Sequence, residues 1–138
     1  MDKLQGMLRE KGLKITAPRL QVLELLMKKE WRHSSAERIQ QALKAKNVSI
    51  ALATIYRVLA QFEEVGLVYK HTFNSQNAIY ELHSTEHHDH MICVDCGKIL
   101  EFCDETIEKR QHIISEKMGF KMINHDMAIY GMCRECTN

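Results

Sequence analysis

The chain has 138 residues, of which 45% are hydrophobic and 27% charged, and this balance excludes a disordered or low-complexity protein. No apolar stretch approaches the ~20 residues that a membrane-spanning helix needs, and the first six residues contain no apolar signal segment. We therefore expect a cytoplasmic protein without membrane contact, whose five cysteines are metal ligands or free thiols rather than disulfides.

The charge is divided unevenly along the chain. Residues 1–82 hold 13 Lys and Arg against 8 Asp and Glu, whereas residues 83–138 hold 6 against 10. The acidic part also contains all five cysteines and six of the eight histidines. This contrast predicts two domains, 1–82 and 83–138, with different functions. The second is short for an apolar core of its own, and chains of that size often need a metal ion or a partner subunit.

The basic part begins with four helical patterns. Thr16 offers an N-cap, and Pro18 lies in the first turn of the following helix, where its missing N–H costs little. The predicted helices are residues 3–11, residues 17–29, a helix from a capping box at Ser34–Glu37 to Asn47, and a helix from a Ser49 cap to Gly66.

After Gly66 the hydrophobic period changes to two. Residues 68–73 and 78–82 predict a hairpin with a turn at residues 74–77, and helices followed by a hairpin predict a winged helix-turn-helix domain. The acidic part predicts a strand over 88–94, a cysteine-bearing turn, a strand over 98–102, a helix over 104–118 and a strand over 121–130. The whole is an α+β fold, a winged helix-turn-helix domain followed by a small α/β domain.

The fourth helix is the candidate for DNA recognition. Its outer face carries Ala53, Arg57 and Ala60, flanked by Thr54 and Tyr56. Small residues let a helix approach the major groove closely, and an arginine there can form two hydrogen bonds to guanine. An ordinary solvated helix face is the alternative. Candidates for phosphate contacts are Lys14, Arg19, Lys28, Lys29, Arg32 and Lys70.

Two Cys-x-x-Cys pairs form the strongest local motif. Cys93 and Cys96 make one pair, and Cys133 and Cys136 make the other. Two such turns complete a tetrahedral thiolate set, which suits a structural zinc ion with no open position. Two redox dithiols or four buried cysteines are the alternatives. Cys103 is left over, and we expect it to be a partly buried residue without a metal.

The segment His87-His88-Asp89-His90 is a second candidate metal cluster. In a strand, alternate side chains point to opposite faces, so His87 and Asp89 would face one way and His88 and His90 the other. One strand could then supply two metal sites with nitrogen and oxygen ligands, which suit Fe(II), Mn(II), Co(II) or Zn(II). A solvated polar stretch is the alternative. More distant candidate ligands are His33, Glu81, His83, Glu101, Glu108 and His125.

These motifs resemble those of the ferric uptake regulator family of bacterial metal-dependent transcription factors. The resemblance lies in residues 12–19, residues 53–59, residues 87–97 and the final cysteine pair, in the order the family has them. It implies a winged-helix DNA-binding domain with a hinge over 1–82, and a metal-binding α/β dimerisation domain over 83–138.

The resemblance also implies three sets of metal ligands and a DNA-binding set. The structural zinc set is Cys93, Cys96, Cys133 and Cys136; the regulatory set is His33, Glu81, His88, His90 and Glu101; the additional set is His87, Asp89, Glu108 and His125. For DNA it implies Tyr56 and Arg57 on the recognition helix and Lys14 in the minor groove, beside our candidates Arg19 and Thr54.

The implied function is a repressor of iron homeostasis genes that needs Fe(II), for which Mn(II), Co(II) or Zn(II) can substitute. Its partners would be an AT-rich inverted-repeat DNA operator and a second copy of the chain, in a homodimer or a tetramer, with no small-molecule substrate. A sensor of zinc, manganese or peroxide is the near alternative. Glu81 and Glu101 stand where a peroxide sensor typically has aspartate, which favours iron.

Two alternatives come from other classes. A metalloenzyme could use an open metal site with Asp89 or Glu81 as the base, but the chain has no His-Glu-x-x-His motif and no phosphate loop. A thiol redox protein could use one Cys-x-x-Cys pair. We expect no catalytic residues.

Overall fold

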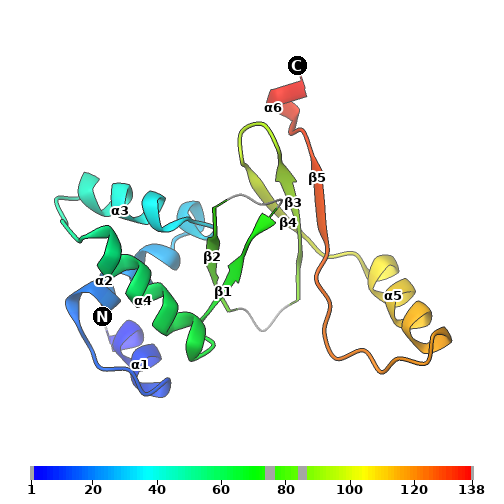
Figure 1. Ribbon diagram of the computed structural model, residues 1–138, viewed down its shortest axis with the longest axis horizontal. Helices are drawn as coiled ribbons and strands as arrows, with labels where there is room; N and C mark the ends of the chain where they lie inside the picture. The colour runs from blue at the N-terminus through cyan, green and yellow to red at the C-terminus, as the bar shows by residue number, and fades with distance from the viewer. Residues whose placement is uncertain (1, 74–76, 84–86, 138) are drawn as a thin grey trace. The chain divides into compact units, whose positions relative to one another are not determined.

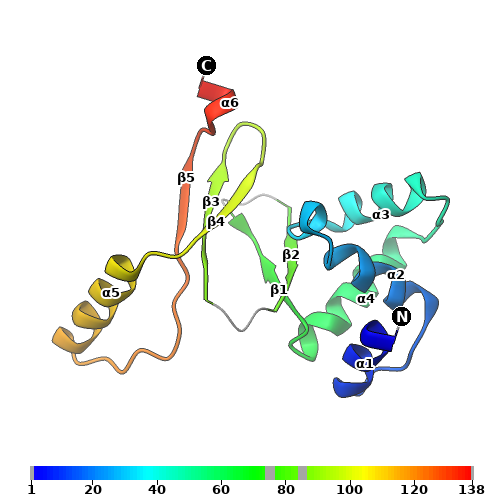
Figure 2. The same ribbon diagram turned by 180° about the vertical axis from the view of Figure 1, so that it is seen from behind.

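The computed structural model describes residues 2–73, 77–83 and 87–137, which form two compact units, residues 1–83 and 84–138 (Figures 1 and 2). Its helices and small sheets confirm the predicted α+β fold class. In the described part of the chain, no helix is long and apolar enough to span a membrane.

The first unit is helical and ends in a hairpin. Its elements are α1 (Asp2–Glu10), α2 (Ala17–Leu26), the short 3-10 helix η1 (Lys29–Trp31), α3 (Ala36–Ala45), α4 (Leu52–Glu64), β1 (Val68–His71) and β2 (Ile79–Leu82). The two strands pair antiparallel, with Val68 opposite Leu82 and Tyr69 opposite Glu81. This is the predicted winged-helix order, although the predicted turn at 74–77 lies mostly outside the described residues.

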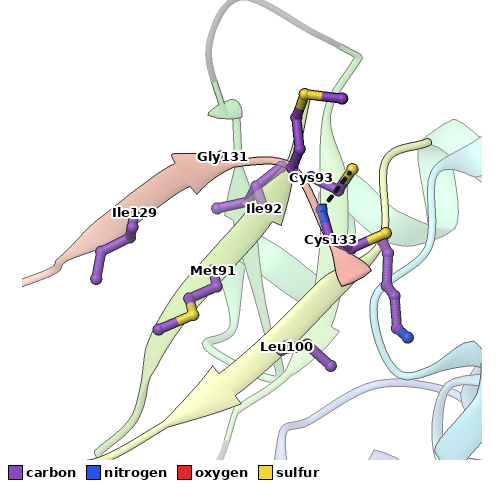
Figure 3. Close-up of a pocket in the computed structure, with 9 residues that line it drawn as sticks. Met91, Ile92, Cys93, Leu100, Ile129, Gly131 and Cys133 are labelled. Carbon is purple, nitrogen blue, oxygen red and sulfur yellow. Dashed lines mark hydrogen bonds between the residues drawn. The ribbon is translucent and has the colours of Figure 1, made fainter. Parts of the chain in front are cut away.

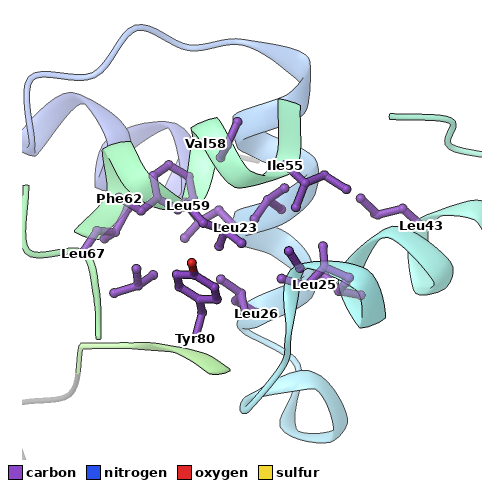
Figure 4. Packing of buried hydrophobic residues seen from close by; sticks show 14 of the residues in the cluster. Leu23, Leu25, Leu26, Leu43, Ile55, Val58, Leu59, Phe62, Leu67 and Tyr80 are labelled. Atoms are coloured by element: carbon purple, nitrogen blue, oxygen red, sulfur yellow. The ribbon is translucent and has the colours of Figure 1, made fainter. Parts of the chain in front are cut away.

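The first unit has a hydrophobic core that determines which face of α4 points outward. Leu23 from α2 and Ile55, Leu59 and Phe62 from α4 are fully buried, and Tyr80 from β2 packs against them (Figure 4). Burying one large apolar side chain contributes roughly 1.5–3 kcal/mol, so rotating α4 out of this core would be costly. The opposite face of α4 is therefore presented to solvent.

Several helix boundaries follow the predicted signals. The Thr16 hydroxyl accepts the Arg19 N–H at 3.4 Å at the start of α2. After α4, Gly66 takes φ +77°, a conformation that favours glycine, and Leu67 N–H donates to the Phe62 carbonyl at 2.8 Å. Helix α2 stops at Leu26 rather than 29, because Lys28 is extended and residues 29–31 form η1 instead.

Two predicted helix caps are wrong. The N-cap of α3 is Ser35, whose hydroxyl accepts the Arg38 N–H at 3.1 Å. Ser34 is not available as a cap because its backbone pairs with Tyr80 in a bridge to β2 and its hydroxyl donates to the Trp31 carbonyl at 2.7 Å. Helix α4 begins after Ala51, two residues past Ser49, without a side-chain cap.

The second unit is built on a three-stranded sheet with strand order β4-β3-β5. It contains β3 (Asp89–Cys93), β4 (Ile99–Phe102), α5 (Glu105–Lys117), β5 (Ala128–Gly131) and α6 (Arg134–Thr137). Strand β3 pairs antiparallel with β4 and parallel with β5. The last strand is shorter than the predicted 121–130, because only residues 128–131 pair with β3. Helix α6 was not predicted, since four residues carry no helical period.

The second unit buries very little of itself. Among its described residues, only Asp89, His90, Ile92 and Cys93 are buried, and α5 contributes none. Large apolar side chains are instead exposed, namely Met91, Val94, Leu100, Ile113, Ile114, Met118, Phe120, Ile123, Ile129, Tyr130 and Met132. A unit of this kind needs other interactions to hold it together.

Candidate metal centres and nucleic-acid interface

The four cysteines of the paired motifs come together at one end of the sheet. Cys93 ends β3, and the parallel pairing of β3 with β5 places it opposite Gly131, two residues before Cys133. Gly97 closes the first turn at φ +80°, and its N–H donates to the Cys93 carbonyl at 2.9 Å. The four Sγ atoms, one of which belongs to Cys136 from α6, all lie within 4.8 Å of one another.

The geometry of the sulfur atoms fits a single tetrahedral metal ion. Cys96 Sγ and Cys133 Sγ lie 3.7 Å apart. Two thiolates on one tetrahedral zinc, with Zn–S bonds of about 2.3 Å, are separated by about 3.8 Å. The backbone N–H groups of Cys96 and Cys133 each donate to Cys93 Sγ at 3.4 Å, and they lower the pKa of the Cys93 thiol to about 6. A thiolate, which is the form that binds metal, is thereby favoured at Cys93.

The leftover cysteine differs from our expectation. Cys103 follows β4 and is exposed, rather than partly buried. Local desolvation raises the pKa of its thiol, and the negative charges of Glu108 and Asp89 raise it further. It therefore stays a neutral thiol at neutral pH.

A second group joins three separate segments of the second unit. Asp89 from β3 is fully buried, and its Oδ1 lies 3.1 Å from His87 Nε2. Glu108 from α5 lies 3.3 Å from the same His87 nitrogen and 2.9 Å from His125 Nε2. The ligand atoms of all four residues lie within 4.8 Å of one another.

This second group also fits a metal ion. The other carboxylate oxygen of Asp89, Oδ2, is buried and has no hydrogen-bond partner among the described residues. A buried carboxylate oxygen left in this way costs free energy unless a cation or proton satisfies it. Two imidazoles and two carboxylates are ligands suited to Fe(II), Mn(II), Co(II) or Zn(II).

The remaining predicted ligands lie in two groups, one in each unit. In the second unit, His88 Nε2 is 2.9 Å from Glu101 Oε1, and the rings of His88 and His90 are 5.0 Å apart. Glu101 on β4 pairs with His90 on β3. Strand β3 begins at Asp89 rather than at the predicted 88. The segment from His87 to His90 nevertheless divides as alternation predicts, with His88 and His90 near one set of groups and His87 and Asp89 near another.

In the first unit, His33 Nε2 lies 3.0 Å from Glu81 Oε2. Glu81 is on β2 and is only 1% exposed. His71, which we did not predict as a site residue, lies with its Nε2 2.5 Å from the other oxygen, Glu81 Oε1. The sequence alone gave no signal for it, because the contact depends on the hairpin register, in which Tyr69 opposes Glu81 and His71 shares the face of Tyr69.

The outer face of α4 has the exposure that DNA recognition requires. Ala53, Tyr56, Arg57 and Ala60 are exposed, while Thr54 is partly buried. The Tyr56 hydroxyl donates to the carboxylate of Glu37 on α3, and this hydrogen bond raises the pKa of Tyr56. The phenol is thus held in place on the helix surface.

Arg19 has structural partners as well as its predicted role. Its guanidinium donates to Gln61 Oε1 on α4 at 3.2 and 2.9 Å, and to the Lys14 carbonyl at 2.7 Å. It therefore fixes the backbone of Lys14, whose side chain is exposed, against α4. The segment before α2 is tied to the candidate recognition helix.

A winged-helix unit with an exposed arginine-bearing helix, followed by a small sheet unit rich in convergent metal ligands, defines a metal-responsive transcriptional regulator. The model of the Ferric uptake regulator family matches residues 10–130. The chain belongs to this family, whose members regulate transcription and are not enzymes.

Individual relatives agree with this assignment. The ferric uptake regulation protein of Legionella pneumophila is 48% identical over 129 residues, covering 94% of this chain and 95% of the relative. The crystal structure of the Vibrio cholerae ferric uptake regulator has a TM-score of 0.89 and 43% identity, covering 94% of this chain and 98% of that one. The Helicobacter pylori regulator, described as having three functional metal binding sites, has a TM-score of 0.85 and 33% identity, covering 99% and 91%.

Proposed function

We propose that this protein is an Fe(II)-dependent DNA-binding repressor that controls iron homeostasis. The observation that carries the proposal is the division of one ligand set between the two units. His33 and Glu81 belong to the first unit, and His88, His90 and Glu101 belong to the second. Neither group alone has enough ligands for a closed metal site, whereas the five together do.

The proposed switch follows from this division. If both groups bind one ion, the orientation of the DNA-binding unit relative to the dimerisation unit is restricted. The ion can shift that equilibrium only by as much as it prefers the DNA-binding arrangement. The regulatory site is therefore His33, Glu81, His88, His90 and Glu101, and Fe(II) is its metal, which Mn(II), Co(II) or Zn(II) can replace. Its nitrogen and oxygen ligands suit these ions and include no soft thiolate.

The cysteine group is proposed to hold a structural Zn(II), with Cys93, Cys96, Cys133 and Cys136 as its ligands. The sulfur separations support it, and so does the nearly coreless second unit, because metal binding can supply folding free energy where apolar burial does not. The group of His87, Asp89, Glu108 and His125 is proposed as an additional metal site. It would join β3, α5 and the segment before β5. Three sites agree in number with those described for the Helicobacter pylori relative.

The proposed DNA contacts lie on the first unit. Arg57, Tyr56 and Thr54 on α4 would enter the major groove of an AT-rich inverted repeat, and Lys14 would enter the minor groove beside it. Arg19 is proposed to contact a DNA phosphate and, through its hydrogen bond to the Lys14 carbonyl, to position Lys14. Two such units, related by a two-fold axis, would match the two halves of the repeat.

The second unit is proposed to form a homodimer, with a tetramer as the larger alternative. Met91 on β3 pairs with Leu100 on β4 and Ile129 on β5, so these three side chains form one row across the sheet (Figure 3). They are 42%, 50% and 42% exposed and border a pocket that reaches Cys93 and Cys133. An apolar row of this kind on a unit without a core is suited to a second copy of itself, which would cover it symmetrically.

The test is anaerobic fluorescence anisotropy on an AT-rich inverted-repeat operator, with Fe(II), Mn(II) and Zn(II) titrated separately. Binding that appears with Fe(II), disappears on chelation and is absent on random duplex supports the proposal. Binding that responds only to Zn(II) or Mn(II) at low concentration would instead assign the alternative sensor. Operator binding that is equal with and without metal would rule out the switch.

A further inference from the structure

The buried carboxylate of Glu81 has a different partner on each oxygen. His33 Nε2 lies 3.0 Å from Oε2, and His71 Nε2 lies 2.5 Å from Oε1. All three residues belong to the first unit. The proposed regulatory site accounts for His33 and Glu81, but it gives no role to His71.

The hairpin holds the His71 ring in this position. His71 lies on β1 diagonally across from Glu81, since Tyr69 is the direct partner of Glu81 in the register, and diagonal neighbours are within reach of long side chains. The ring stacks on Phe73, with centroids 5.0 Å apart and planes 10° from parallel, and Tyr69 packs on it at 6.2 Å. The side chain is only 17% exposed. Its orientation is therefore set by the fold before any ligand binds.

In this contact, His71 can donate a hydrogen bond to Glu81, the carboxylate that we propose as a metal ligand. A neutral imidazole has one N–H, and at Nε2 it can donate to Oε1. Because the contact with His71 is made by Oε1, the oxygen that would face a cation is Oε2, on the His33 side. Partners of this kind orient the ligands of metal sites, and their loss typically costs 10–100-fold in metal affinity.

We propose that His71 is a positioning residue of the regulatory metal site. It donates its Nε2–H to Oε1 of Glu81 and thereby presents Oε2 alone to the divalent ion, as a monodentate ligand beside His33. His71 itself does not bind the ion. The proposal builds on the proposed regulatory role of Glu81 and adds an outer residue that determines how that carboxylate binds.

The test measures Co(II) binding to the full-length protein, which keeps its zinc, by visible absorption in competition with a chelator. Every variant carries His125→Ala, so that Co(II) binding at the additional site is suppressed. We expect His71→Ala to weaken Co(II) binding roughly 10–100-fold, with zinc content and circular dichroism unchanged. His71→Gln, whose amide can donate to Oε1, should recover most of the affinity. The ligand-field spectrum of the bound Co(II) should be the same in all of them, because no ligand is lost.

His83→Ala is the matched control, because His83, a candidate ligand from the sequence alone, belongs to none of the three ligand groups found among the described residues. His83 follows the same hairpin, and its ring packs on Tyr69 at 4.7 Å. We expect its removal to leave Co(II) affinity unchanged, which separates an effect on Glu81 from a general loosening of the hairpin. An equal loss of affinity in His83→Ala and His71→Ala would overturn the inference.

Three other results would also overturn the inference, and they differ in whether the proposed regulatory site would remain valid. Unchanged affinity in His71→Ala, with Glu81→Ala weakened, would remove the role of His71 and keep the regulatory site. A changed Co(II) spectrum in His71→Ala without rescue by His71→Gln would make His71 a direct ligand. Unchanged affinity in Glu81→Ala would remove the proposed regulatory site and the role of His71 with it.

Discussion

Arg57 is the residue whose side chain we expect to read the operator sequence. It is exposed on α4, opposite the buried face of Ile55 and Leu59. Arg57→Ala should weaken operator binding by roughly 1–3 kcal/mol if the guanidinium makes two hydrogen bonds to a guanine. Fluorescence anisotropy on operator and on random duplex measures both losses. An equal loss on the two DNAs would mean that Arg57 contacts phosphate and carries no sequence specificity.

His90 is the residue whose substitution we expect to separate metal sensing from folding. It is buried on β3, in register with Glu101 and with its ring 5.0 Å from that of His88, and it lies outside the cysteine group. His90→Ala should keep the proposed zinc and the fold but abolish metal-dependent operator binding, because the proposed regulatory set loses one of its ligands. Zinc content, circular dichroism and anisotropy with and without Fe(II) provide the measurement. Metal-independent binding as tight as that of the metal-loaded wild type would contradict the expectation.

The division of the histidine strand could be predicted from the sequence because the side-chain period of a strand is fixed at two. His87 contacts Asp89 and Glu108, while His88 contacts Glu101, as alternation requires. His71 could not be assigned in the same way. Its contact with Glu81 depends on the register of β1 and β2, and the connection between them gave no tight-turn motif that would set it.

At the scale of elements, the cysteine turns connect β3 to the segment after β5. Cys96 follows β3, and its sulfur is 3.7 Å from that of Cys133. Cys96→Ser should release the proposed zinc and unfold the second unit, because that unit has only four buried residues among those described and metal binding would supply much of its folding free energy.

Metal content and hydrogen exchange of the two units would measure this effect. The first unit, with its own hydrophobic core, should stay protected from exchange while the second unit loses protection. A Cys96→Ser protein that lacks zinc and yet keeps a protected sheet and its subunit state would show that the metal is not structural.

Helix boundaries were predictable where the signal was local. Thr16 and Gly66 act through their own neighbours, as a hydroxyl cap and as a residue at positive φ. Ser34 was misread because a distant strand overrides the local signal: its backbone pairs with Tyr80. The strand at 121–130 was predicted too long because apolar residues such as Ile123 suggested pairing, whereas Ile123 is exposed and only residues 128–131 reach β3.

At the scale of the whole molecule, the exposed apolar row of the second unit predicts a dimer. Met91→Glu would place a charge in the middle of that row, where burial against a second copy would be unfavourable. We expect this variant to be a monomer with much weaker operator binding, as judged by sedimentation velocity and anisotropy. Met27→Glu is the matched control, because Met27 is exposed to a similar degree, 38% against 42%, but lies at the end of α2 in the first unit. Both variants remaining dimeric would place the interface elsewhere.

The segment from His87 to His90, whose last two residues lie in β3, has a consequence for how the gene can change. Substitutions at single positions alter one metal-ligand group at a time, because neighbouring side chains serve opposite faces. An in-frame insertion of one codon between His88 and Asp89 would move the side chains that follow it to the other face. Asp89 would then leave the face of His87, His90 would leave the face of His88, and both ligand groups would be divided in a single event. In this segment, we therefore expect related genes to differ by codon replacement and to keep the number of codons constant.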